Sequence, residues 1–200
     1  MQDLGRLGIV FEETLSGWTA VGETDFMEGK LKGQRENSQL RFDSRVKIPN
    51  FQQFLSDPNH LAHLEGTVTF SPFQGSFPMR EGLFSLFSTD PKTGFIRMTY
   101  AFRFTALGKN YYVLGIKNIK HHSGRVDVFK DMTTLYTKIY EGEDDTGLIV
   151  AAGIIYFKLF NFVPLMIHMK VPGAHSFLER LAGKKAFAEF SLGVLKKEYL

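Results

Sequence analysis

Residues 96 to 105 alternate between apolar and mostly polar side chains, and this period of two constrains the fold more than any other feature of the chain. Successive side chains of a β-strand point to opposite faces of its sheet, so this segment has one apolar and one wet face. A short glycine-containing turn at residues 106 to 110 separates it from residues 111 to 117. We therefore predict an antiparallel hairpin, with Arg97 and Arg103 outward. The side chains expected to face inward are those of Met98, Tyr100, Phe102 and Phe104.

The same alternation recurs along the chain, and glycines separate the runs. Several short strands between turn signals are typical of an antiparallel barrel or barrel-like sandwich rather than of a β-α-β fold. We predict a mainly β fold of this class with a few short helices, as one domain over residues 1–200, a length that can bury roughly 70% of the unfolded surface. The further strand segments are residues 40–48, 66–70 and 132–140, and the helical ones are residues 49–55, capped by Asn50, 162–169 and 175–182.

Phenylalanine is unusually frequent, with 20 residues in a chain of 200. Large flat side chains fill a wide interior or line a cavity for a flat apolar ligand, and composition alone leaves both open. The formal net charge of +3 comes from 24 basic and 21 acidic residues without a long block of one sign. We therefore expect no nucleic-acid partner.

The N-terminus lacks the basic start and apolar run of a secretory signal, so we expect a cytoplasmic protein. Cysteine is absent, which excludes disulfides. Polar residues and a proline interrupt the most apolar stretch, residues 148 to 169, so no transmembrane segment is expected, while peripheral membrane contact stays open. Within this stretch, residues 151 to 153 are small enough for a backbone or ligand to approach closely, and residues 157 to 169 are expected to form an apolar surface or lid.

Catalytic signatures are weak. No Gly-x-Ser-x-Gly segment points to a serine hydrolase, and no Gly-x-Gly-x-x-Gly follows an expected strand, so we expect no cofactor. His60 with His63 and His121 with His122 are interpreted as surface or loop residues, and no metal site is expected. Of the neighbouring Glu12 and Glu13 on an expected strand, one would face inward and need a basic or hydroxyl partner. The arginines that could supply it are Arg41, Arg45, Arg97 and Arg103.

Several phrases occur together in a distinctive order. They are Phe11-Glu12-Glu13-Thr14-Leu15-Ser16-Gly17-Trp18, Leu64-Glu65-Gly66-Thr67-Val68, Gly82-Leu83-Phe84-Ser85-Leu86-Phe87, Met98-Thr99-Tyr100, Gly115-Ile116-Lys117, residues 127–136 and Glu141-Gly142. This order, over roughly residues 9 to 195, resembles an accessory β region attached to, or encoded near, bacterial glucose-methanol-choline oxidoreductases of the cholesterol-oxidase-like kind. The resemblance implies a role in sterol or lipid metabolism beside a flavin oxidoreductase, and carries no flavin site into this chain.

Residues 127 to 136 combine the most distinctive part of this resemblance with a carboxylate and hydroxyl groups. We expect them at the mouth or wall of the main cavity, with Asp131 as the polar anchor, although Asp131 could equally cap a turn. The expected ligand-binding residues are Asp131, Thr133, Tyr136, Glu13, Trp18, Tyr100 and Phe102.

The leading functional hypothesis is a non-enzymatic binding or accessory domain for a hydrophobic, sterol-like or lipid-like small molecule, acting beside an oxidoreductase. One alternative is a small isomerase or cyclase that uses Asp131, Glu13 or a histidine in the same cavity. Another is a structural assembly module without a ligand.

Overall fold

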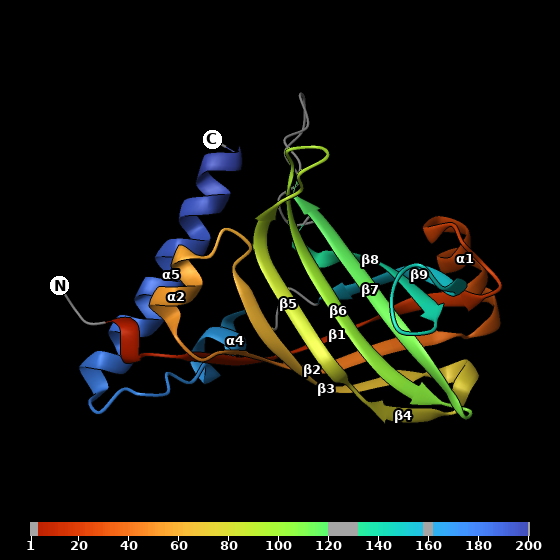
Figure 1. Ribbon diagram of the computed structural model, residues 1–200, viewed down its shortest axis with the longest axis horizontal. Helices are drawn as coiled ribbons and strands as arrows, with labels where there is room; N and C mark the ends of the chain where they lie inside the picture. Colours follow the sequence, from red (N-terminus) through yellow and green to blue (C-terminus); the bar gives the residue numbers. More distant parts are fainter. Residues whose placement is uncertain (1–3, 120–131, 158–161, 200) are drawn as a thin grey trace.

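The computed structural model describes residues 4–119, 132–157 and 162–199, and a curved antiparallel sheet forms its body (Figure 1). The strands are β1 (Ile9–Val21), β2 (Gln39–Ile48), β3 (Leu61–Phe70), β4 (Gly75–Pro78), β5 (Arg80–Thr89), β6 (Ile96–Ala106), β7 (Lys109–Ile119), β8 (Thr134–Glu141) and β9 (Leu148–Phe157).

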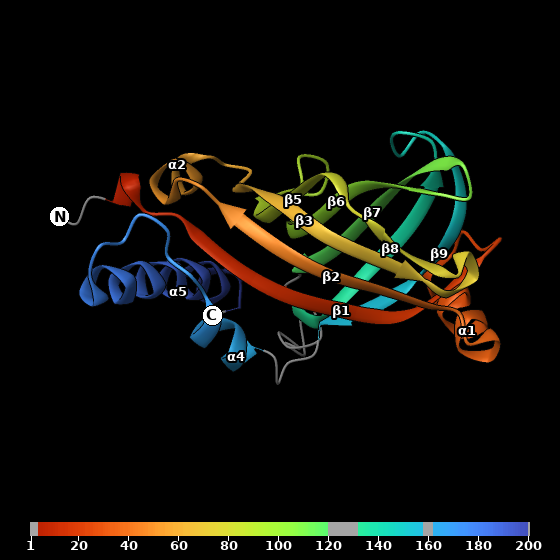
Figure 2. The same cartoon turned by 90° about the horizontal axis from the view of Figure 1, so that it is seen from below.

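Eight of these strands close into a barrel. The hydrogen-bonded order is β2-β1-β9-β8-β7-β6-β5-β3, and antiparallel pairing of β2 with β3 joins the two ends of the series. The short β4 pairs with β3 outside this ring. Figure 2 shows the tilted strands wrapping around the interior. The predicted mainly β, antiparallel barrel is confirmed, and closure removes the exposed edges of an open sheet along most of the wall.

The predicted hairpin is confirmed as β6 and β7, which pair from Ile96↔Ile119 to Ala106↔Lys109. Its turn consists of Leu107 and Gly108, both with positive φ (51° and 75°), as a two-residue turn that matches strand twist requires. All four side chains predicted to face inward are at most 4% exposed, and the two arginines of β6 are not among the buried residues.

Aromatic side chains fill much of the barrel interior. Phe42 and Phe102 meet edge to face with ring centroids 5.0 Å apart, and Phe104 stacks on Tyr111 at 5.3 Å. Each buried phenylalanine contributes about 1.5–3 kcal/mol relative to an exposed one. Much of the high phenylalanine content is therefore explained by packing.

Within the described residues, the helices labelled beside the barrel are α1 (Phe26–Glu36), α2 (Phe51–Ser56), α4 (Phe162–His168) and α5 (Phe177–Tyr199). The described residues also form two 3-10 turns, η1 (Leu4–Arg6) and η2 (Ser71–Phe73). The side chain of Asn50 caps α2 by accepting from the Gln53 amide at 2.9 Å, as predicted. In Figure 1, α1 lies at one end of the molecule, and α2 and α5 lie at the other.

Helix α1 packs backbone to backbone on the barrel. A Cβ atom at Gly29 would lie 2.0 Å from the carbonyl oxygen of Ala152, and one at Gly33 would lie 2.6 Å from that of Thr19. Only glycine allows so close an approach. The expected close approach at residues 151 to 153 is therefore made by the backbone of α1.

Helix α5 is much longer than the predicted residues 175 to 182. It continues because its second half also has an apolar side: Phe187 is 6% exposed and packs against the rings of Phe11 and Phe51, while Phe190 meets Phe54. The predicted helix at residues 162–169 is present as α4. No helix in the described ranges is long and apolar enough to cross a membrane.

Candidate functional site

A carboxylate enters the barrel wall from β1. Phe11 and Leu15 are buried members of the inward phase of this strand, and Glu13 lies between them in the same phase. Although Glu13 as a whole residue is partly exposed, its Oε1 atom is buried and has no hydrogen-bond partner among the described residues. The predicted inward glutamate is thus Glu13, and Glu12 points to solvent.

Two polar groups from the β6–β7 hairpin lie with this carboxylate. Tyr100 is 1% exposed and Lys117 is 3% exposed. The Lys117 Nζ atom donates a hydrogen bond to the Tyr100 hydroxyl at 3.3 Å, and the Glu13 carboxyl group is near enough to that hydroxyl to raise its pKa. Nζ also lies 5.1 Å from the centre of the Tyr100 ring and 5.6 Å from that of Phe157. The result is a polar cluster among aromatic rings, here called the Glu13 cluster.

Burial dominates the electrostatics of the Glu13 cluster. It raises the pKa of Glu13 above the usual 4.5, and the charge of Lys117 and the hydrogen bond from Tyr100 offset this only in part. Burial likewise lowers the pKa of Lys117 below 10.5, against the attraction of Glu13. The pKa of Tyr100 lies well above 10 because of burial and, secondly, the negative Glu13. The site therefore favours a neutral carboxyl, amine and phenol more than water does.

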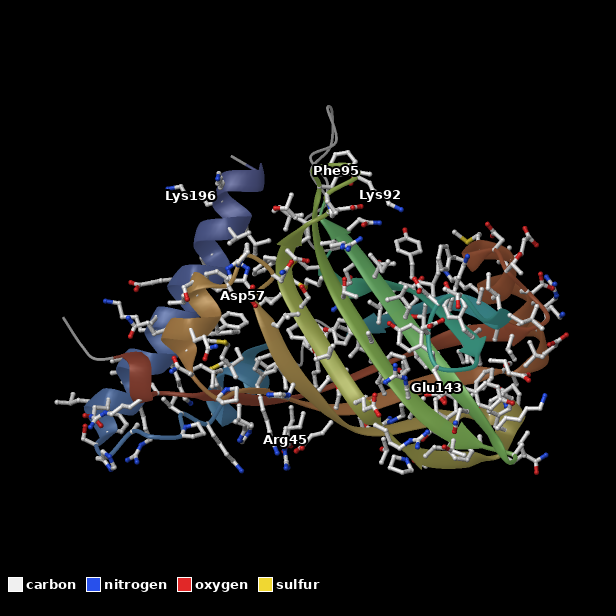
Figure 3. The ribbon with its side chains drawn as sticks, viewed as in Figure 1. Arg45, Asp57, Lys92, Phe95, Glu143 and Lys196 are labelled. Atoms are coloured by element: carbon white, nitrogen blue, oxygen red, sulfur yellow. The ribbon has the colours of Figure 1, made fainter. Side chains whose placement is uncertain are left out.

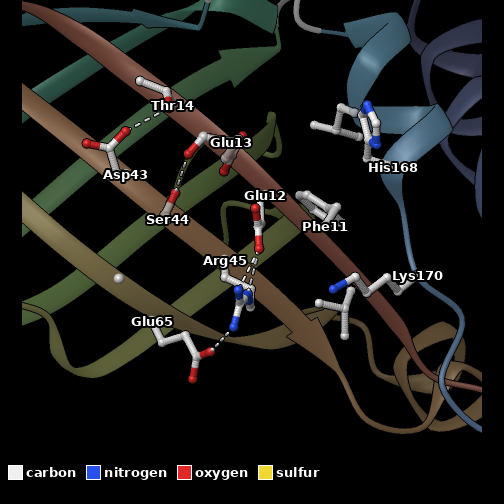
Figure 4. Close-up of a pocket in the computed structure, with 13 residues that line it drawn as sticks. Phe11, Glu12, Glu13, Thr14, Asp43, Ser44, Arg45, Glu65, His168 and Lys170 are labelled. Atoms are coloured by element: carbon white, nitrogen blue, oxygen red, sulfur yellow. Dashed lines mark hydrogen bonds and ion pairs between the residues drawn. The ribbon is translucent and has the colours of Figure 1, made fainter.

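The barrel wall changes beside this cluster. Pairing of β1 with β9 begins only at Leu15↔Phe157, so Glu13 lies just beyond the end of β9. Next to it is a pocket of about 840 Å³ between strands β1 to β3 and helix α4 (Figure 4). The residues that line it are Val10, Phe11, Glu12, Glu13, Thr14, Asp43, Ser44, Arg45, Glu65, Gly66, Leu165, His168 and Lys170. Glu13 therefore belongs both to the inward phase of β1 and to the lining of an open pocket.

Ion pairs cross the outer side of this pocket. Arg45, labelled in Figure 3, pairs with Glu12 at 2.6 Å and with Glu65 at 3.5 Å. These groups are about half exposed, so each pair contributes only about 0–1 kcal/mol. The inward glutamate has a basic and a hydroxyl neighbour, as expected, but these are Lys117 and Tyr100. Arg45, one of the four arginines considered for this role, lies on the outward phase of β2 and pairs with Glu12.

The predicted ligand-binding residues separate into groups. Tyr100 and Phe102 are both inside the barrel, but of these two only Tyr100 belongs to the Glu13 cluster. Trp18 lies three residues after buried Leu15, so on a strand its side chain points to the opposite, outer face of β1. Tyr136 also faces outward, with its ring 5.4 Å from that of Phe26 in α1. The structure therefore does not bring these last two to the Glu13 cluster.

Asp131, the predicted anchor, lies outside the described residues, as do His121 and His122. Thr133 is described and partly buried. Sequence reasoning did not select Lys117, although a signal was present: it shares the phase of Tyr111, Val113 and Gly115 in β7, which is the inward phase.

Of the two histidines near β3, one packs against aromatic rings and the other is exposed to solvent. His60 lies between the rings of Phe54 and Phe190, at 5.4 and 4.9 Å, and burial lowers its pKa. His63 is exposed on β3. Across the described ranges, no group of three or more histidine or acidic residues could hold a metal ion.

Comparison with known proteins gives no family assignment. No family model, no curated protein and no solved structure matches the chain.

Proposed function

We propose that this protein is a non-enzymatic binding domain for a mostly apolar, sterol-like or lipid-like molecule whose polar group meets the Glu13 cluster. One observation carries the proposal: the buried Oε1 atom of Glu13 lacks a hydrogen-bond partner in the described part of the chain, and its residue lines an open pocket. A buried polar group without a partner costs about 1–3 kcal/mol. A ligand that donates a hydrogen bond to Oε1 would remove this cost.

The chemistry of the cluster selects the polar group of the ligand. A hydroxyl group can donate to Oε1 of Glu13, whereas a carboxylate has no proton to donate and would bring its own negative charge into a buried site. The apolar part of the ligand would lie against Phe11 and Leu165, which contribute to the same pocket. An alcohol with a large apolar body, such as a sterol or a long-chain alcohol, satisfies both requirements.

A second function is favoured by the raised pKa of Glu13. A carboxyl group whose pKa is raised by burial holds its proton more readily than one in water and can pass it to a substrate, as an isomerase or cyclase requires. Under this alternative Glu13 transfers the proton, while Lys117 and Tyr100 stabilise its charged form. Turnover of an unsaturated sterol or lipid that stops in the Glu13→Gln variant would favour this function over simple binding.

The proposed cellular setting rests on the sequence resemblance. A domain that holds a sterol-like alcohol could present it to a flavin oxidoreductase of the glucose-methanol-choline type in the cytoplasm. Co-purification of such an enzyme with the tagged protein from its native host tests the partnership, and its absence under gentle conditions would count against it.

The direct test is native mass spectrometry of the purified protein, followed by solvent extraction. We expect a stoichiometric apolar alcohol on the wild-type protein and much less on Glu13→Gln. As a control, Glu141→Gln removes an exposed carboxylate, which pairs with Lys109 at the turn end of the β6–β7 hairpin, and should keep the ligand. A folded protein that stays empty after incubation with sterols and long-chain alcohols would refute binding and favour a structural module.

A further inference from the structure

Large apolar side chains are exposed where helices α4 and α5 meet. Ile167 near the end of α4 is 63% exposed, and three side chains in the first turns of α5 are 53–71% exposed. Those three are Phe177, Leu178 and Leu181. Lys184 holds the two helices together, since its Nζ atom donates to the carbonyl oxygens of Met166 and Ile167 at 3.1 and 2.6 Å.

A groove of about 500 Å³ runs along the same region, between residues 169 to 174 and the start of α5. Its lining is largely apolar and includes Met169, Val171 and Phe177. The charged residues of the lining are all basic: Lys170, Arg180 and Lys184. We call the four exposed apolar residues and these three basic residues together the α4–α5 face.

The positive charge of this face is not cancelled by the neighbouring acid. Glu179, in the first turn of α5, forms an ion pair with Arg6 and also accepts a hydrogen bond from the His175 amide. Within the described residues, neither Lys170 nor Arg180 forms an ion pair with a carboxylate. Exposed apolar side chains thus lie beside basic side chains that have charge available for a partner.

We propose that the α4–α5 face docks on the surface of a membrane that contains anionic lipids. Apolar side chains that protrude singly can enter the boundary between headgroups and acyl chains, and basic side chains beside them can reach lipid phosphates. Each lysine or arginine near an anionic membrane surface strengthens binding about fivefold. The attachment is peripheral and uses side chains of α4, α5 and the segment between them.

Vesicle co-sedimentation of the full-length protein tests this proposal. The probes are vesicles of phosphatidylcholine alone and of phosphatidylcholine mixed with phosphatidylglycerol. We expect markedly tighter binding to the mixed vesicles, and weakening of that binding at high salt, because salt screens the lipid charge. Equal binding to both vesicle types, or none to either, would overturn the proposal.

Two variants locate the docking surface. The double substitution Leu178→Ser with Leu181→Ser should weaken binding at least tenfold while the protein stays folded, since both side chains are exposed. The double substitution Lys170→Gln with Arg180→Gln should weaken binding to the mixed vesicles and leave binding to phosphatidylcholine vesicles unchanged. The matched control, Leu107→Ser with Leu148→Ser, removes two leucines that are 71% and 76% exposed, in the β6–β7 turn and at the start of β9, and should bind like wild type.

Size-exclusion chromatography and circular dichroism of the same variants distinguish membrane docking from self-association through this face. If the wild type is a dimer that the Leu178 and Leu181 substitutions dissociate, and vesicles do not bind, the face is an interface between copies and the proposal is wrong. If the folded leucine variant still binds mixed vesicles like wild type, the membrane contact lies elsewhere and the proposal is also wrong.

Discussion

A double-mutant cycle on Glu13 and Lys117 tests whether the Glu13 cluster is an energetically coupled unit. Lys117→Met removes the amine and leaves the buried carboxylate of Glu13 without its positive neighbour. Removing one partner of a buried charge pair costs up to about 3–5 kcal/mol, and the cost is lower here to the extent that burial keeps the two groups neutral. Glu13→Gln keeps a group that can hydrogen-bond Tyr100 but removes the attraction that supports the charge of Lys117.

The double variant is expected to be far more stable than the sum of the single effects implies. At an effective dielectric constant of about 20, two unit charges about 5 Å apart attract each other by about 3 kcal/mol. Removing both charges also removes both desolvation costs, so the double variant should lie within about 1–2 kcal/mol of wild type. Urea unfolding of the four proteins, followed by circular dichroism, measures the coupling.

The pH dependence supplies a second readout. The pKa of Glu13 is raised in the fold, so its neutral form stabilises the protein below about pH 4.5, and this contribution is lost as the pH rises through the folded-state pKa. The pKa of Lys117 is lowered, so the cost of charging it is relieved as the pH rises from the folded-state pKa toward 10.5. As the pH rises above about 4.5, wild type should therefore lose stability relative to Glu13→Gln. As the pH rises toward 10.5, wild type should gain stability relative to Lys117→Met. The coupling would be refuted if the effects of the two single substitutions on the free energy of unfolding added up to that of the double variant within about 0.5 kcal/mol, and if the stability differences did not change with pH.

Three further predictions concern the fold that holds the site, and all are measured as free energies of unfolding. Gly29→Ala should destabilise the protein by about 2–3 kcal/mol because its Cβ would lie 2.0 Å from the Ala152 carbonyl oxygen, whereas Gly193→Ala, in an open helical position, should stabilise it by about 1 kcal/mol. Equal effects would show that α1 does not pack as closely as described. Phe102→Ala should cost about 3–5 kcal/mol and Leu107→Ala less than about 0.5, since their exposures are 0% and 71%; a small loss for Phe102 would contradict the packed interior. Asn50→Ala should cost about 1 kcal/mol by removing the cap of α2, and an unchanged stability would exclude that role.

The barrel was predictable because its strands have one wet face. Alternation along β2 and β6 shows which residues are buried, and tertiary packing follows that pattern. Helix α1 was not predicted for the opposite reason: its buried residues are Gly29 and Gly33, so it has no apolar stripe of the usual kind. Its docking depends on the absence of side chains, which hydrophobic periodicity cannot register.

The candidate site was predictable only in part. The alternation along β1 indicated that one of two glutamates faces inward and needs a basic or hydroxyl partner, but only arginines were named as candidates. Lys117 is buried because its strand phase points inward, and such a lysine is rare enough that a cation is ordinarily assigned to the surface. Trp18 shows the converse, since its size suggested the interior while its phase puts it outside. Strand phase was the better guide in both cases.

The most direct test of the central claim is an equilibrium titration with dehydroergosterol, a fluorescent sterol with one hydroxyl group. Trp18 is the only tryptophan in the chain, so energy transfer from it reports binding from a single donor. We predict saturable binding by wild type and by Glu141→Gln, and at least tenfold weaker binding by Glu13→Gln, since about 1.4 kcal/mol corresponds to a factor of ten. Equal affinity of all three proteins would contradict the claim that Glu13 anchors the ligand, and no saturable transfer in wild type would contradict sterol binding itself.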